Sequence, residues 1–195
     1  MYRVDLSTGT SAKTLESTSG GLIAATANGL YLPITGEKKS GISYRDLASS
    51  EVTNRLELTE PVSMLGAALS HDGLRFALVV EDGAAGTRSV QVMPAEGGER
   101  RTVFSVTKPE SLGGGSITWA GDGAALFCIR LHAGSPATRE VWRIPVDGGQ
   151  PVNTGIAMDF ITSTRAQPNG SHLLFNAGQW TTDFVALEHI LPGRK

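Results

Sequence analysis

The sequence predicts an all-β fold, and three observations support that prediction. Turn dipeptides recur at a nearly constant spacing, at Asn28-Gly29, Asp72-Gly73, Asp122-Gly123 and Asn169-Gly170. A second series of turns alternates with the first, at Thr8-Gly9, Ser49-Ser50, Gly97-Gly98 and Gly148-Gly149. Between the turns lie short apolar or alternating runs without a sustained helical period. A unit of roughly forty to fifty residues with four such strands has the size of one β-propeller blade.

Each repeat contributes its strands in the same order. An apolar run follows each Asn/Asp-Gly pair, at 30–34, 75–80, 125–129 and 172–176. An alternating run comes next, at 41–47, 89–94, 140–146 and 183–190, and a polar fourth strand at 52–58, 100–105 and 150–154. The one helical candidate, 45–58, aligns with strand, turn and strand in the other repeats, so we expect no helix there. The glycine pairs in "AEGGE" and "VDGGQ" recur one blade apart and precede strands, which indicates hairpin turns and not phosphate loops.

The repeats define a single β-propeller region over 1–195. It divides into a partial blade at 1–17, full blades at 18–59, 60–108 and 112–155, and an incomplete blade at 156–191. The runs 1–6 and 12–15 fit strands three and four of a blade, which leaves one strand more than four closed blades need. Because open strand edges are prone to association, we expect the C-terminal part of a larger propeller, or a ring completed by another chain. A compact four-bladed ring with one spare strand is the alternative.

Composition excludes several classes of function. The chain has 195 residues, a net charge of -2 and no run of basic residues longer than pairs such as Lys38-Lys39 and Arg100-Arg101, so we expect no basic surface that tracks nucleic acid. No apolar run is long enough for a membrane-spanning helix. The single cysteine, Cys128, excludes an internal disulfide, and its place in "AALFCIRL" predicts a buried, unreactive thiol.

Two of the repeats resemble a known family. The stretches "LSHDGLRFALVV…SVQVMPAEGGERRTVF" and "TWAGDGAALFCIR…EVWRIPVDGGQPV" are similar to the WD40-like (PD40) repeats of TolB-like propellers. His71 and Ala120-Gly121 depart from that family's Ser-Pro-Asp-Gly turn, and the first repeat is the poorest match. The resemblance implies a bacterial propeller that serves as a scaffold or sensor domain in a periplasmic or extracytoplasmic place, although the first ten residues show no signal peptide.

The candidate binding residues recur at one end of the blades. Asp72, Asp122 and Asn169 could face a central channel and bind a cation or a basic peptide, but turn chemistry explains them more simply. Trp180, in the loop "AGQWTTDF", is the aromatic with the fewest reasons to be buried and is the best single candidate for contact with a partner. Ser70, His71 and Asp72 resemble a compressed triad, yet consecutive residues cannot align a catalytic relay.

The other candidates are expected to be structural. His71, His132, His172 and His189 lack the spacing of a zinc site, and we expect His132 to lie in a loop. Trp119 and Trp142 are expected to pack between blades. The glycine-rich stretch 111–123 lacks the lysine and helix of a phosphate loop, and we expect a linker between blades. We therefore predict no catalytic residue, cofactor or metal.

These observations favour a non-enzymatic propeller that binds a protein or a peptide through its loops or channel mouth. The alternative is an accessory propeller that controls substrate entry to a prolyl-oligopeptidase-like or tricorn-like peptidase whose catalytic domain lies outside this chain. Neither the Gly-x-Ser-x-Gly turn nor a distant catalytic histidine that would indicate such a domain is present. We expect no nucleic-acid partner and no membrane insertion, and an oligomer or additional N-terminal blades as the means of closing the ring.

Overall fold

The computed structural model describes residues 2–4, 7–13, 21–115, 117–167, 169–170 and 172–178. Every regular element among them is a β-strand, and all strand pairs are antiparallel. The strands form five sheets, two of two strands, two of four and one of five. The predicted all-β propeller fold is therefore confirmed, including the absence of a helix over 45–58. The described residues contain no helix that could cross a membrane.

The sheets follow one another in chain order. The first pairs β1 (Tyr2–Val4) with β2 (Ser11–Lys13). Blade I contains β3 (Ala24–Ala25), β4 (Gly29–Thr35), β5 (Lys39–Asp46) and β6 (Val52–Thr59). Blade II contains β7 (Val62–Leu69), β8 (Arg75–Asp82), β9 (Thr87–Pro94) and β10 (Arg101–Thr107).

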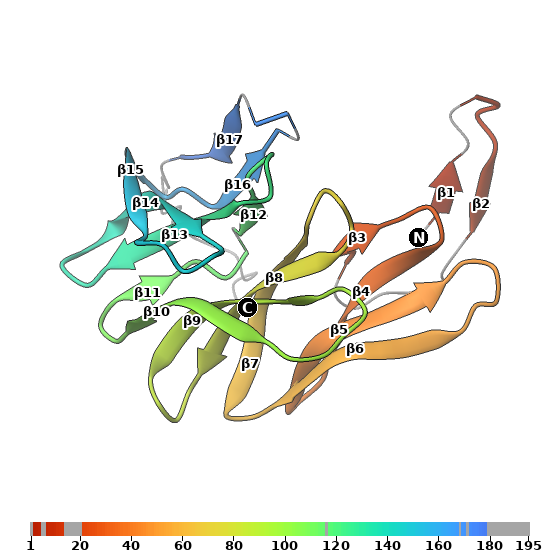
Figure 1. The fold of residues 1–195 in the computed structure, drawn as a ribbon, viewed down its shortest axis with the longest axis horizontal. Coiled ribbons are helices and arrows are strands. Elements are labelled where there is room, and N and C mark those ends of the chain that lie inside the picture. Colours follow the sequence, from red (N-terminus) through yellow and green to blue (C-terminus); the bar gives the residue numbers. More distant parts are fainter. Residues whose placement is uncertain are drawn as a thin grey trace, which may run out of the picture.

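Blade III contains β11 (Ser111–Leu112), β12 (Thr118–Trp119), β13 (Ala125–His132), β14 (Ser135–Pro145) and β15 (Val152–Asp159). Partial blade IV pairs β16 (Ser163–Ala166) with β17 (Leu173–Asn176). Figure 1 shows the blades arranged along a curve, from β3–β6 in orange through β7–β10 to β11–β15 in green and teal and β16–β17 in blue. The third strand expected over 183–190 lies outside the described residues.

The Asx-Gly dipeptides close the same hairpin in blades II, III and IV. The register pairs Leu69 with Phe76, Trp119 with Leu126 and Ala166 with Leu173, so equivalent residues flank each turn. Gly73, Gly123 and Gly170 have φ values of 75°, 67° and 76°, a region that glycine enters without steric cost. The Gly-Gly turns lie where they were predicted, between β9 and β10 and between β14 and β15.

The glycine-rich stretch 111–123 was expected to be a linker between blades, and this expectation is wrong. β11 and β12 both pair with β13, so this stretch is the innermost strand of blade III, interrupted by a loop. The loop projects against β7, where a Cβ on Gly66 would lie 1.7 Å from the carbonyl oxygen of Gly114. The chain therefore needs glycine here because two backbones from neighbouring blades meet.

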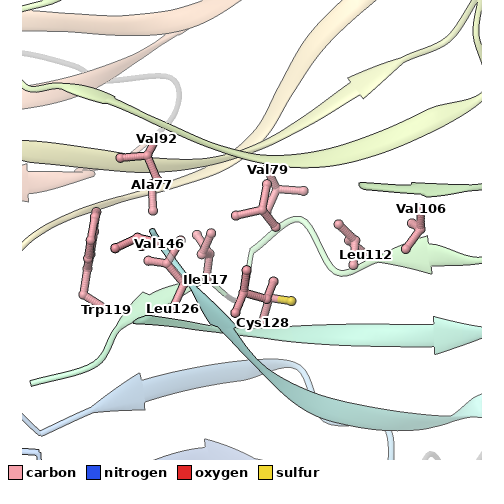
Figure 2. Close-up of a cluster of buried hydrophobic side chains, with 12 residues drawn as sticks. Ala77, Val79, Val92, Val106, Leu112, Ile117, Trp119, Leu126, Cys128 and Val146 are labelled. Atoms are coloured by element: carbon pink, nitrogen blue, oxygen red, sulfur yellow. The ribbon is translucent and has the colours of Figure 1, made fainter. Parts of the chain in front are cut away.

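The hydrophobic core consists of clusters between blades. β8 is buried on both faces: Phe76, Leu78 and Val80 pack toward blade I, whereas Ala77 and Val79 pack toward blade III. This alternation follows from the two-residue period of a strand. Figure 2 shows the cluster between blades II and III, with Ala77 and Val79 facing Trp119, Leu126 and Cys128.

Cys128 is fully buried, and burial raises the pKa of its thiol to about 12. The predicted burial is therefore confirmed, and the raised pKa supports the prediction of an unreactive thiol, because the thiolate is the reactive form.

Candidate functional site

The innermost strands of the blades surround a hollow that we call the axial hollow. It consists of two adjoining cavities of about 550 and about 220 Å³, which share Ile23, Ala67, Gly115 and Arg165 in their walls. These residues come from blades I, II, III and IV in turn. One end of the hollow reaches Lys39 and Ser40, and the other reaches His71. The axial hollow is therefore where all the described blades meet.

Small side chains keep the axial hollow open. β7 contributes Gly66, Ala67 and Ala68, and the interrupted strand of blade III contributes Gly115. A Cβ on Gly115 would meet no atom within 4 Å, so open space lies directly beside this backbone. Larger apolar side chains, among them Leu22, Ile34, Met64, Leu65 and Leu69, form much of the remaining wall. An extended chain could therefore approach the backbone closely at the glycine and alanine positions.

The charge of the axial hollow is positive. Its described lining contains Lys39, His71 and Arg165 but no carboxylate. Lys39 is partly neutralised, since its Nζ lies 2.6 Å from Glu57 Oε1. Arg165 is exposed, and its Nη1 donates to the neighbouring carbonyl of Thr164 at 2.9 Å. Arg165 is thus the cation most available to a ligand in this hollow.

The aspartates predicted from the repeat are used by their own turns. Asp72 accepts hydrogen bonds from Ser70 Oγ and from the Leu74 amide, and these donors hold the pKa of its carboxyl below the ordinary value. Asp122 accepts from the Ala124 amide at 2.9 Å. Neither carboxylate lines the axial hollow. These bonds are the turn chemistry expected of Asx residues.

The apparent triad at residues 70–72 is also part of a turn. Ser70 is buried, donates through Oγ to Asp72, and accepts the Arg75 amide at 2.9 Å. His71 is exposed and lines the axial hollow, with its side chain separate from this pair. The hydroxyl and carboxylate are thus both engaged in closing the hairpin.

A second hollow brings two of the predicted residues together. Asp122 and Asn169 both line a cavity of about 510 Å³ between blades III and IV, which we call the inter-blade hollow. Arg143 and Phe127 form its blade III wall, and His172 and Leu173 belong to blade IV. Asp72 belongs to the turn of blade II and does not line the inter-blade hollow. Trp180 lies outside the described residues.

His132 was expected in a loop but is the last residue of β13. Its Nε2 lies 2.8 Å from Glu140 Oε2, and its Nδ1 lies 3.2 Å from Glu110 Oε2. The hydrogen bond with Glu140 raises the pKa of His132, and the same contact lowers the pKa of Glu140. Among the described residues, no three histidine, cysteine, aspartate or glutamate side chains form a group that could hold a metal ion. His189 lies outside the described residues.

Both described tryptophans pack between blades, as predicted. Trp119 of blade III is buried, and its Nε1 donates to the Ala68 carbonyl of blade II at 3.0 Å. Trp142 of blade III stacks on Phe104 of blade II with the ring centroids 6.4 Å apart, and its Nε1 donates to Glu140.

Arginines that bridge consecutive blades were not found from the sequence. Each donates from one blade to a backbone carbonyl of the next: Arg55 to Glu96, Arg75 to Gly123, Arg88 to Leu112, Arg101 to Val146, and Arg139 to Ile161. Arg88 and Arg139 each lie six residues before a proline that ends a strand. This shared position is the sequence pattern that could have pointed to these bridging arginines. Charged donors to carbonyls stabilise more than neutral ones, so these side chains help to hold neighbouring blades in register.

Comparison with known proteins extends the description at the level of the fold. No protein-family model and no curated protein matches the chain. An oligogalacturonate lyase in complex with manganese is similar over 91% of this chain and 53% of its own, with a TM-score of 0.65 and 16% identity. TolB from Acinetobacter baumannii is similar over 91% of this chain and 43% of its own, with a TM-score of 0.60 and 17% identity.

A prolyl endopeptidase is similar over 78% of this chain and 25% of its own, with a TM-score of 0.55 and 17% identity. The chain thus spans about half or less of the length of these structures. Because two of the three are enzymes and one is TolB, the likeness identifies the propeller fold and leaves the activity open.

Proposed function

We propose that this chain is a non-enzymatic β-propeller module that binds a neutral or acidic peptide segment of a partner protein in the axial hollow. The observation that carries the proposal is the lining of this hollow: small residues from four inner strands, with Arg165 exposed among them and no carboxylate in the described walls. From the sequence, Asp72, Asp122 and Asn169 were considered as a site for a basic peptide. The positive lining of the axial hollow favours a neutral or acidic peptide instead.

The physical support comes from access and charge. Glycine and alanine along the inner strands let a peptide backbone come close enough to reach backbone donors and acceptors. An acidic side chain or a terminal carboxylate could then pair with the Arg165 guanidinium, whose planar group suits a carboxylate. Charge complementarity of this kind contributes to specificity and to the association rate.

The non-enzymatic part of the proposal has its own support. The hydroxyl and carboxylate that most resemble catalytic groups, those of Ser70 and Asp72, are bonded to each other and to turn amides. The accessory role in a peptidase is supported only by the fold-level likeness to a prolyl endopeptidase, so it stays the second interpretation.

Selection of random peptides displayed on phage tests the proposal. We expect peptides with an acidic residue or a free carboxyl terminus to be enriched, and their affinity to fall at least about tenfold in R165E, as expected for loss of a charge-paired contact. K108E is the matched control, because it makes the same change of charge at an exposed residue outside the hollow. Failure to enrich any peptide, or equal losses in both variants, would overturn the proposal.

A further inference from the structure

Each boundary between neighbouring blades contains three equivalent positions, which the strand register defines. Two positions pair with each other on the second and third strands of one blade: Tyr31 with Tyr44, Ala77 with Val92, and Phe127 with Arg143. The third is the residue before the turn in the next blade: Leu69, Trp119 and Ala166. The boundaries can therefore be compared position by position.

The first two boundaries are filled by large side chains. Between blades I and II, the rings of Tyr31 and Tyr44 lie 4.9 Å apart, and Leu69 packs against the same cluster. Between blades II and III, Ala77 and Val92 are small, and the indole of Trp119 occupies the space with 1% of its surface exposed. Figure 2 shows Trp119 beside Ala77 at this boundary.

Among the described residues, no such side chain fills the third boundary. Ala166 stands where Trp119 and Leu69 stand in the preceding blades, and Phe127 and Arg143 leave the inter-blade hollow of about 510 Å³ open beside it. Phe127, Arg143 and Ala166 are each only partly buried, whereas Ala77, Val92 and Trp119 are buried. Within the part of blade IV that the structure describes, the space that an indole occupies at the neighbouring boundary is therefore open at this one.

We propose that the inter-blade hollow binds a planar aromatic group of about the size of an indole. Phe127 and Leu173 supply apolar walls from two blades, and Arg143 supplies a guanidinium. No carboxylate of the described residues forms an ion pair with Arg143. The inter-blade hollow shares Ala166 with the axial hollow, but Phe127, Arg143 and Leu173 line the inter-blade hollow alone. A change at Arg143 therefore tests this inference separately from the proposed function.

The neighbouring boundary shows how this blade geometry holds an aromatic ring. There the Arg75 guanidinium lies 4.7 Å from the centroid of the Trp119 ring, and the indole N–H finds a carbonyl acceptor. Arg143 can act on a bound ring in the same way, since a guanidinium stacks favourably on an aromatic face. The Asp122 carboxylate, which also lines the hollow, is an acceptor for an indole N–H.

Titration of the ¹⁵N-labelled chain with indole, followed by NMR, tests this inference. We expect saturable shifts that include the amides of Ala166, Gly170 and Leu173. The variant A166W places in the hollow the residue that the preceding blade has, so it should weaken indole binding at least about tenfold and raise the melting temperature. A85W is the control, because it adds the same side chain at an exposed turn.

A second variant keeps the test decisive if A166W does not fold. R143Q removes the guanidinium at a partly buried position and should weaken indole binding severalfold. Absence of saturable binding to the unmodified chain, or unchanged affinity in R143Q or in folded A166W, overturns the proposal.

Two short peptides distinguish the sources of the aromatic group. The first peptide is acetyl-Gly-Ser-Trp-Ser-Gly-amide, and the second is its Trp→Ala analogue. If the first binds more tightly than indole and the second does not bind, the aromatic group is the side chain of a partner protein. Binding of indole with exclusion of the peptide indicates a free small molecule. Both outcomes support an aromatic site.

Discussion

The guanidinium of Arg75 in blade II lies over the ring of Trp119 in blade III, 4.7 Å from its centroid. Arg75 Nη2 also donates to the Gly123 carbonyl of blade III at 3.1 Å. One side chain therefore contacts both the buried indole and the turn that follows it. This pair joins two blades at the same end where the inter-blade hollow leaves the next boundary open.

Replacing Arg75 should weaken the boundary between blades II and III. R75Q loses the cation–π contact and the hydrogen bond to Gly123, so we expect the free energy of unfolding to fall by about 1–2 kcal/mol. Urea unfolding measures this change. R100Q is the matched control, because Arg100 is also partly buried but donates to Gln91 within its own blade. Equal destabilisation by both variants would contradict a bridging role for Arg75.

Gly66 should not tolerate a side chain. In G66A the new Cβ would lie 1.7 Å from the backbone oxygen of Gly114, so blade II and the loop of blade III must separate. We expect a loss of about 2 kcal/mol or more in the free energy of unfolding. G134A is the control, since a Cβ there would meet no atom within 4 Å. A stable G66A protein would show that the two backbones do not meet as described.

His132 should make stability depend on pH. Its pKa is raised in the folded chain by the hydrogen bond with Glu140, so its contribution is complete below the unfolded pKa and is lost as pH rises through the folded pKa. The pKa of Glu140 is lowered, so its contribution is present above the unfolded value and is lost as pH falls through the folded one.

Urea unfolding of H132Q and of the unmodified chain at about pH 5.5 and about pH 8.5 measures this dependence, because the two values lie on either side of the ordinary histidine pKa. We expect the two proteins to differ more at the lower pH. H71Q is the control, because His71 is exposed and forms no ion pair with the described residues. A difference that does not change with pH would exclude the contact with Glu140 as its source.

Cys128 should react only when the chain unfolds. Its thiol is buried and has a pKa raised to about 12, so very little thiolate forms at neutral pH. We expect Ellman's reagent to release almost no colour from the folded protein and one equivalent in concentrated guanidinium. Rapid reaction without denaturant would show that blades II and III separate in solution.

Local patterns were sufficient to predict the fold and its turns. Positive φ at Gly73, Gly97 and Gly123, the continuous apolar run of β8 and the alternating run of β9 are encoded within a few consecutive residues. The roles of Asp72 and Asp122 in turns could be predicted for the same reason, because each bonds to an amide two residues away.

Only the tertiary structure decided which side chains meet between blades. Arg75 and Gly123 are 48 residues apart, and so are Thr118 and Ala166, which bond across blades III and IV. The inner strands that form the axial hollow are likewise about a blade apart in the sequence. No pattern within a single repeat determines how two repeats are placed against each other. The sequence shows that Trp119 and Ala166 differ in size. Only the packing of the blades shows that Trp119 fills one boundary and that Ala166 lies beside an open hollow at the next.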